Sequence, residues 1–352
     1  MARRRNGEVD RAVKLTIGIK ALNEERHIAA SIASAVEAAR AFDGEVILAD
    51  SGSTDRTIEI AKQFPIRIVQ LADPSERSCG TGAQLAFQHA SGDYFYLLDG
   101  DMILNAAFIP AGVAFLEQNP EVAAVGGLVN EKNIAGEEYQ IRANTVRTDP
   151  NWLPGVVNRL DCGGLYKVSA VRDVHYFADR NLHAFEELEL AMRLQEKGWK
   201  LARIDVAAVD HFGHSVGGLA MLRRWLRSGY ANAAGEVLRG AIGKPHLLLL
   251  LRQLAHIRHG AVVILWWIAL AACLIFYPLL AIPLALAPLL FLAARRGSLR
   301  LGAYSFATWN VLAIGLLRGL RQRRKPPETA IASVELQAPT SRGSSLASSS
   351  GS

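Results

Sequence analysis

Two aspartates separated by one glycine are the residues in this sequence best suited to chemistry. Asp99-Gly100-Asp101 comes directly after Tyr94–Leu98, an apolar run that predicts a buried strand. Carboxylates at positions i and i+2 of a flexible turn can hold a hard divalent cation, Mg²⁺ or Mn²⁺, next to a polar ligand. The alternative is an ordinary solvated turn, since Asp and Gly both favour turns.

Two more polar segments stand where predicted strands end. Asp50–Thr57 reads DSGSTDRT, and Ile19–Glu25 reads IKALNEE. A helix cap explains the Ser and Thr residues of the first segment, but it does not explain Asp50 at the tip of a buried strand. Ligands of parallel sheets bind beyond the carboxyl ends of the strands. We therefore expect three segments to meet at one edge: Lys20–Glu24, Asp50–Asp55 and Asp99–Asp101.

Strand and helix patterns alternate through the first part of the chain. The predicted strands are Leu15–Ala21, Glu45–Ala49, Ile66–Leu71, Tyr94–Leu98 and Val122–Val125. Segments with helical spacing of apolar residues lie between them, as in βαβ units. The sequence therefore predicts an α/β fold, a Rossmann-like and mostly parallel sheet with flanking helices.

Apolar residues are concentrated in residues 247–317. Ala261–Ala294 is nearly uncharged over 34 residues, apart from breaks at three prolines. A single helix of that length would span about 50 Å, against a hydrocarbon core of about 30 Å. Two short membrane helices in a hairpin fit better. A third segment, Leu301–Leu317, is expected to be interfacial or re-entrant, because a full crossing would export the basic run Arg318–Lys325.

The charge distribution also favours a membrane over nucleic acid. The formal net charge is +6, and arginines flank the apolar segments. The three cysteines, Cys79, Cys162 and Cys273, are far apart and predict neither a disulfide framework nor a zinc site. The basic N-terminus lacks the apolar stretch of a signal peptide. We therefore expect a multi-pass protein of the inner (plasma) membrane with its catalytic domain in the cytoplasm.

The order of these motifs resembles that of the inverting, bacterial-type family 2 glycosyltransferases, whose catalytic domain has the GT-A fold. That family shows Pro-x-x-Asn-Glu after its first strand, Asp-Asp-x-Ser-x-Asp-x-Thr after its second and Asp-x-Asp after its fourth. A Glu-Asp-x-Asp-Leu-x-x-Arg helix follows in the acceptor half. The resemblance covers roughly residues 14–230, and the motifs are specific when taken in order.

The resemblance implies a role for each matching residue at the donor site. Asp50 would accept a hydrogen bond from the nucleotide base, and Asp99 would contact the ribose or the sugar. Asp101 would ligate the metal. The other implied nucleotide-sugar contacts are Ala21, Glu24 and Arg77. The sequence departs from the family at two of these motifs, since Lys20 replaces the usual Pro and Ser51 replaces the second Asp.

The resemblance also places the catalytic base. Glu187 aligns with it, in the segment that begins Glu186-Glu187-Leu188, where the family usually has Asp. Glu is a competent base that reaches about one bond further. The alternative for Glu186 and Glu187 is that they are acidic first-turn residues that stabilise the helix dipole.

Two further elements follow in the acceptor half. His211 is the candidate second metal ligand, with His214 as the alternative, because GT-A enzymes often use a His there. Arg223-Arg224-Trp225 resembles the Arg-Trp of the Gln-x-x-Arg-Trp element in processive synthases, but Met221 replaces the Gln. Arg224 is thus a candidate for stabilising the diphosphate. The alternative is an amphipathic basic helix on anionic lipid.

The predicted function is metal-dependent, inverting transfer of a sugar from a nucleotide-diphosphate sugar to a hydroxyl acceptor, in surface polysaccharide or glycolipid assembly. The expected partners are a lipid-linked or glycan acceptor and membrane lipids, without nucleic acid. The alternatives are a polyprenyl-phosphate sugar transferase, a processive polysaccharide synthase and a non-catalytic nucleotide-binding scaffold. The predicted parts are a flexible N-terminus (1–13), a catalytic domain (14–240, with nucleotide-sugar half 14–125 and acceptor half 126–240), a membrane anchor (241–320, with its hairpin at 261–294) and a disordered tail (321–352).

Overall fold

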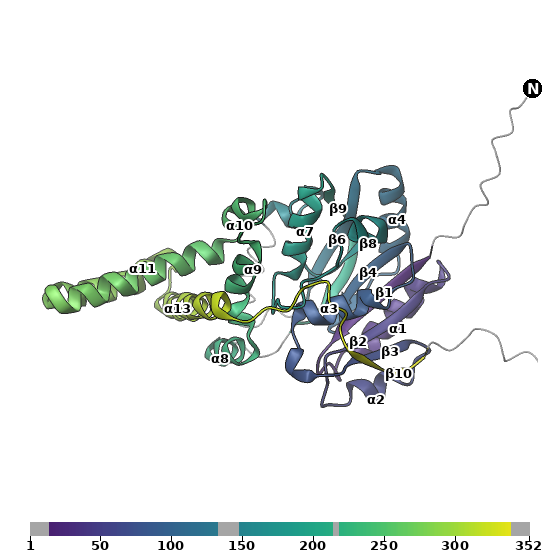
Figure 1. The fold of residues 1–352 in the computed structure, drawn as a ribbon, viewed down its shortest axis with the longest axis horizontal. Coiled ribbons are helices and arrows are strands. Elements are labelled where there is room, and N and C mark those ends of the chain that lie inside the picture. The colour runs from purple at the N-terminus through teal and green to yellow at the C-terminus, as the bar shows by residue number, and fades with distance from the viewer. Residues whose placement is uncertain (1–13, 133–147, 214–217, 339–352) are drawn as a thin grey trace, which may run out of the picture.

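One mixed β-sheet with helices on both faces forms the body of the protein in the computed structural model, which describes residues 14–132, 148–213 and 218–338 (Figure 1). The strands are β1 Leu15–Ala21, β2 Glu45–Asp50, β3 Arg67–Leu71, β4 Tyr94–Asp99, β5 Met102–Leu104, β6 Val122–Glu131, β7 Gly155–Val157, β8 Gly164–Lys167, β9 Lys200–His211 and β10 Ser333–Gln337. The predicted N-terminal segment 1–13 and His214 lie outside the described residues.

Helices connect these strands and continue beyond the sheet. They are α1 Ile28–Arg40, α2 Thr57–Ala61, α3 Cys79–Gln88, α4 Phe108–Gln118, α6 Val168–Asp173, α7 Glu186–Glu196, α8 Gly218–Ser228, α9 Ala233–Ala241, α10 Leu247–Gln253, α11 Ala255–Phe276, α12 Pro278–Arg296 and α13 Leu299–Arg321. Three short 3₁₀ turns complete the described elements: η1 Pro74–Glu76, η2 Pro150–Trp152 and η3 Tyr230–Asn232.

The first four strands place their carboxyl ends at one edge of the sheet. β1 pairs in parallel with both β2 and β4, and β2 pairs in parallel with β3. In this register Ala21 lies opposite Asp50, and Lys20 lies opposite Asp99. The prediction that these segments meet at one edge is therefore confirmed.

The parallel arrangement ends at β4. β8 runs antiparallel to both β4 and β6, and β5 and β7 run antiparallel to β9, while β6 and β9 are parallel. The predicted α/β fold is confirmed, but the complete sheet is mixed, and the parallel order holds among β1 to β4. The antiparallel strands are short or lie among less regular sequence, where periodicity gives little sign of strand direction.

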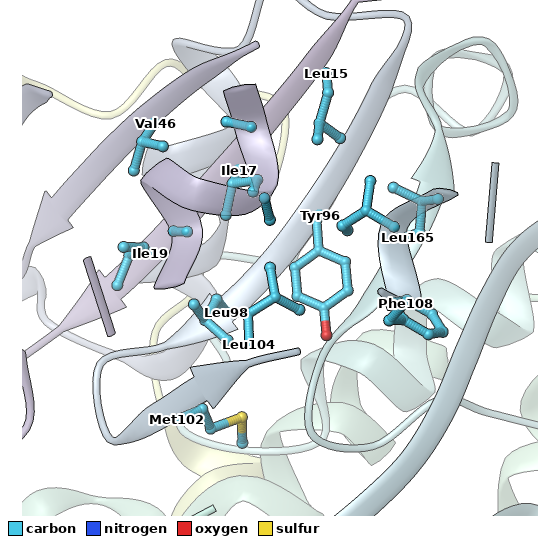
Figure 2. Close-up of a cluster of buried hydrophobic side chains, with 14 of the residues drawn as sticks. Leu15, Ile17, Ile19, Val46, Tyr96, Leu98, Met102, Leu104, Phe108 and Leu165 are labelled. Atoms are coloured by element: carbon cyan, nitrogen blue, oxygen red, sulfur yellow. The ribbon is translucent and has the colours of Figure 1, made fainter. Parts of the chain in front are cut away.

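Alternating side chains of β4 supply the cores on both faces of the sheet, as the period of a strand requires. Tyr96 and Leu98 join the cluster that packs against α1 and α4, whereas Phe95 and Leu97 join the cluster beneath α3 and α6. Figure 2 shows the first cluster, with Tyr96 beside Leu165 and Phe108. Both faces of β4 are thus buried, which fixes the strand that carries Asp99.

Two long apolar helices follow the catalytic body. α11 and α12 have 22 and 19 residues, and by length and composition each could cross a membrane. A break at Tyr277, just before Pro278, separates them, as predicted for the hairpin. The first helix begins at Ala255 rather than near 261. Its first turns contain polar residues, so the apolar run that predicted the helix starts later than the helix itself.

The third segment, α13, leads from the apolar helices back to the catalytic body. It contacts α11 and α12 and also α9 and η3. A Cβ on Gly315 would lie 1.9 Å from the backbone oxygen of Ala231, and one on Gly319 would lie 2.2 Å from that of Asn232. These glycines therefore allow backbone-to-backbone packing that any side chain would prevent.

The predicted disorder of residues 321–352 is wrong for residues 322–338, which we call the C-terminal strap. β10 pairs antiparallel with β3, Ile331 is 2 % exposed, and Gln88 exchanges two hydrogen bonds with the Ile331 backbone. The Pro- and Ser-rich composition suggested disorder, but an exposed sheet edge provides backbone partners that composition does not reveal. Residues 339–352 lie outside the described residues.

Candidate active site

A cleft of about 880 Å³ lies at the carboxyl edge of the parallel strands. Seven of the predicted site residues line it: Ala21, Glu24, Arg77, Asp99, Asp101, His211 and Arg224. Asp50, Glu186 and Glu187 are not among the lining residues. The structure thus gathers seven of the ten predicted site residues around one cavity, whereas Asp50 and the predicted base lie outside its lining.

Gly100 allows the aspartate turn to lie tightly against the first strand. Its backbone N–H donates to the Lys20 carbonyl at 3.0 Å. A Cβ at this position would lie 3.0 Å from the Glu24 Cγ and 3.2 Å from the Ala21 Cβ. The glycine between the two aspartates therefore brings the DGD turn up to the segment that follows β1.

A lysine holds two carboxylates at the base of the cleft. The Lys20 Nζ lies 2.7 Å from the Glu186 Oε1 and 3.2 Å from the Asp99 Oδ1. Burial works against the ammonium, but Asp99 and Glu186 outweigh it and raise the pKa of Lys20. The residue that departs from the family's Pro thus joins the DGD turn to the first turn of α7, a link that the sequence did not reveal.

Asp101 and His211 form the pair with metal-ligand chemistry. The His211 Nε2 lies 3.5 Å from the Asp101 Oδ2, and the two residues are 9 % and 8 % exposed. The Glu131 Oε2 accepts a hydrogen bond from the other ring nitrogen, Nδ1, at 2.8 Å. Burial opposes protonation of His211, but its hydrogen bonds with Asp101 and Glu131 prevail and raise its pKa to about 9. A cation would therefore have to displace a proton from His211, so the affinity of this site for the cation should rise with pH.

Glu131 is a functional candidate that sequence reasoning missed. It ends β6, and the pairing of β6 with β9 places it opposite His211. Glu131, Cys162 and His211 also offer ligand atoms within 4.8 Å of one another. No motif marks Glu131 in the sequence, because its position depends on pairing between strands about 80 residues apart.

Glu24 is an unusual carboxyl group on the same wall. Burial, together with the charges of Asp101 and Asp99, raises its pKa to about 8. At neutral pH Glu24 therefore carries a proton in the free protein and can donate a hydrogen bond to a ligand oxygen.

Asp50 is fully buried and organises the loop after β2. It accepts hydrogen bonds from the Gly52 and Ser53 backbone N–H groups at 2.9 Å each, from the Gln70 Nε2 at 2.8 Å, and from the Ser53 hydroxyl. Its neighbour Ser51 lines the cleft instead. A hydrogen bond from the nucleotide base to Asp50 stays a prediction, while the contacts present give Asp50 a role in shaping the pocket.

The two glutamates of α7 differ in their partners. Glu186 is 6 % exposed and ion-paired with Lys20, whereas the Glu187 Oε1 accepts a hydrogen bond from the Gly163 N–H at 3.1 Å. Burial raises the pKa of Glu187, although Lys20 opposes the shift. Glu187 therefore belongs to the same group of charges as Lys20, and its role as base stays a prediction.

The opposite wall comes from the elements next to α13. Met221, Arg224, Trp225 and Arg227 of α8 line the cleft, as does Tyr230 of η3. The Trp225 and Tyr230 rings stack with centroids 5.2 Å apart. The cleft thus has acidic residues on the sheet side and arginines with aromatic rings on the α8 side, which suits a phosphate-bearing ligand held through a cation.

The family of this domain follows from sequence comparison. Residues 16–175 match the model of glycosyl transferase family 2, and this part of the chain is a domain of that family. The match places a family 2 glycosyltransferase domain in the first half of the chain, and the fold is shared with a solved glycosyltransferase of the GT-A type. The resemblance suggested by the order of the motifs is thereby confirmed.

Individual relatives agree with this assignment. EpsE of Bacillus subtilis (strain 168), which carries a provisional glycosyltransferase name, is 28% identical over 197 residues, covering 53% of this chain and 68% of EpsE. The mannosyltransferase PcManGT of Pyrobaculum calidifontis, solved in complex with GDP-Man and Mn²⁺, shares the fold with a TM-score of 0.58. It is 18% identical, and the match covers 88% of each chain.

Proposed function

We propose that this chain transfers a sugar from a nucleotide-diphosphate sugar to a hydroxyl acceptor, with inversion and at a membrane, in surface polysaccharide or glycolipid assembly. The observation that carries the proposal is the single cleft that Asp99, Asp101, His211 and Arg224 line together. Acidic and imidazole ligands on one wall and a guanidinium on the other match the charges of a cation-bound diphosphate.

The residues present fit a divalent cation. Asp101 supplies a carboxylate and His211 an imidazole nitrogen, 3.5 Å apart and largely shielded from solvent. Oxygen and nitrogen donors of this kind suit Mg²⁺ or Mn²⁺. Charge that develops on the leaving diphosphate would be neutralised by a cation bound there. Mn²⁺ in the complex of the mannosyltransferase that shares this fold supports the assignment.

The remaining chemistry is one displacement at the anomeric carbon. Glu187 accepts the proton of the acceptor hydroxyl as the hydroxyl oxygen bonds to that carbon and the bond to the diphosphate breaks. Attack on the face opposite the leaving group inverts the carbon. Arg224, on the other wall of the cleft, stabilises the released diphosphate.

The helices outside the sheet support action at a membrane. α11 and α12 are long and apolar enough to cross one, and most of their side chains are exposed. α13 contacts both apolar helices and also α8, which lines the cleft. Arg223 and Arg227 of α8 are exposed, as on a helix that lies against anionic headgroups. This arrangement favours an acceptor delivered by the bilayer and a catalytic domain at the cytoplasmic face of the inner membrane.

A donor screen tests this proposal directly. The full chain, reconstituted in vesicles with lipid extract, is incubated with a panel of UDP- and GDP-sugars and Mn²⁺ or Mg²⁺. We expect nucleoside diphosphate release together with sugar incorporation into the lipid fraction, both stopped by a chelator. NMR of the product is expected to show the inverted anomer. Folded protein that releases no nucleotide from any donor would contradict the proposal.

Glu131 gives a more specific prediction about the cation. Glu131→Ala should weaken Mn²⁺ binding about 10- to 100-fold, because the carboxylate that orients His211 through Nδ1 is lost. Glu131→Gln keeps an oxygen acceptor for that N–H and serves as the matched control, with a smaller loss expected. Titration of Mn²⁺ by electron paramagnetic resonance measures both. Equal affinity in wild type and Glu131→Ala would exclude this role.

A further inference from the structure

The C-terminal strap reaches from α13 to the far edge of the sheet. It crosses α3 and ends in β10, which lies beside β3 (Figure 1). Along the way its backbone bonds the segment before α7: the Lys325 N–H donates to the Asn181 Oδ1 at 2.8 Å, and the Asn181 Nδ2 donates to the Lys325 carbonyl at 2.9 Å. Residues that follow the apolar helices thus pack against the catalytic body.

One side chain of the strap contacts the wall of the cleft indirectly, through Glu76. The Lys325 Nζ donates to the Glu76 Oε1, and the Arg180 Nη2 donates to the Glu76 Oε2. Arg180 in turn donates to the carbonyls of Thr329 and Ala330 in the strap, at 3.0 and 3.2 Å. The Glu76 carboxylate is therefore held by two cations, one in the strap and one tied to it.

Glu76 is the last residue of η1, and η1 forms part of the cleft. Pro74, Ser75 and Arg77 line the cavity, whereas Glu76 is not among its lining residues. The Arg77 Nε bonds the Pro74 carbonyl at 2.8 Å, so the position of η1 sets the position of the Arg77 side chain. The backbone oxygen of Glu76 also accepts from the Thr81 hydroxyl at 2.8 Å, at the start of α3.

The junction between strap and body is close-packed. Arg324 pairs with Asp179, and its Nη1 donates to the Glu236 carbonyl in α9 at 3.1 Å. A Cβ on Gly240 would lie 2.4 Å from that same Nη1. The end of α13, α9 and the segment around Asp179 therefore meet at one point, immediately before Lys325.

We propose that the C-terminal strap completes the donor site, with Glu76 and Lys325 as positioning residues that hold η1, and with it Arg77, against the nucleotide diphosphate. This inference rests on the proposed function. It extends the donor site to a segment that lies beyond the apolar helices in sequence. The alternative is that the strap only covers the edge of β3, a common means of protecting an edge strand.

A second ion pair in the strap separates these explanations. Arg67 and Glu335 pair at 2.9 Å where β10 meets β3, away from the residues that line the cleft. Glu335→Ala therefore removes a strap contact of similar chemistry without affecting η1. If the strap only protects the edge, Glu335→Ala and Lys325→Ala should behave alike.

The test compares four variants of the full chain in vesicles: Glu76→Ala, Lys325→Ala, Lys325→Arg and Glu335→Ala. Glu76→Ala should raise the donor KM about tenfold, because two charge-assisted contacts are lost. Lys325→Ala should raise it about threefold, since the Lys325 side chain is 59% exposed. In both, kcat should stay within about twofold. Lys325→Arg should restore the wild-type KM, and Glu335→Ala should leave it unchanged.

Hydrogen exchange at residues 72–78 provides a readout that does not require activity. We expect faster exchange there in Glu76→Ala and Lys325→Ala, but not in Glu335→Ala. Unchanged exchange and KM in the first two variants, or equal changes in Glu335→Ala, would overturn the positioning role. If the wild type turns over no donor, the proposed function fails, while the exchange data still decide whether the strap holds η1.

Discussion

Asp101→Asn is expected to lower the rate of sugar transfer at least about 100-fold while the fold stays intact. The amide has the shape of the carboxylate, so packing around this buried position is kept. It lacks the negative charge that, in the proposed site, would hold a divalent cation beside the His211 Nε2, 3.5 Å away. Initial rates at saturating donor, with thermal unfolding of each protein as the check on folding, measure the effect.

Asp210→Asn is the matched control for Asp101→Asn. Asp210 precedes His211 in β9, but its carboxylate bonds Asn130 and Lys132 and does not line the cleft. Its replacement removes the same charge at a residue that does not line the cleft, and we expect activity within about twofold of wild type. Equal losses of activity in the two variants would mean that the loss of one negative charge in this region, and not the loss of a cation site, explains the effect.

Glu187→Gln is expected to lower kcat about 10²- to 10⁴-fold with little change in the donor KM. The amide oxygen can still accept the Gly163 N–H, so the backbone contact is preserved while the basic oxygen is lost. Glu186→Gln provides the comparison. It leaves an oxygen acceptor for Lys20 but removes the charge of the 2.7 Å ion pair. Because Lys20 also holds Asp99, the donor KM should change as well. Steady-state kinetics over a range of donor and acceptor concentrations distinguish the two.

The pH dependence of kcat follows from the same assignment. A base acts in its ionised form, and burial raises the pKa of Glu187. The wild-type rate should therefore fall as pH drops through this raised pKa, and the limb should disappear in Glu187→Gln. A Glu187→Gln variant with normal kcat would exclude the base role. It would favour an acceptor that is already ionised, as in a polyprenyl-phosphate sugar transferase.

The parts of the fold that could be predicted are those determined locally. Apolar runs of strand length, separated by segments with a helical pattern, predicted β1 to β4. Because parallel strands end at the same edge of a sheet, this pattern also placed Lys20, Asp50 and Asp99 together. Asp101 and His211, from motifs about 110 residues apart, do meet in the cleft. The order of the motifs was informative because each stands at the end of its own strand.

The parts that could not be predicted depend on pairing between distant segments. β10 is five residues in a Pro- and Ser-rich tail, and only the free edge of β3 makes it a strand. Glu131 lies beside His211 only because β6 and β9 pair with each other. Asp50, at the expected strand tip, accepts hydrogen bonds from the backbone of its own loop and does not line the cleft, which a strand pattern alone does not reveal.

The most direct test of the central claim is binding of Mn²⁺ and a nucleoside diphosphate to one site. Bound Mn²⁺ is measured by electron paramagnetic resonance, with and without UDP or GDP, in the full wild-type chain and in Asp101→Asn. We predict one tightly bound Mn²⁺ per chain whose affinity increases with the preferred nucleotide, and loss of that binding in the variant. Folded wild type that binds neither ligand, or an Asp101→Asn variant that binds both as wild type does, would contradict the account.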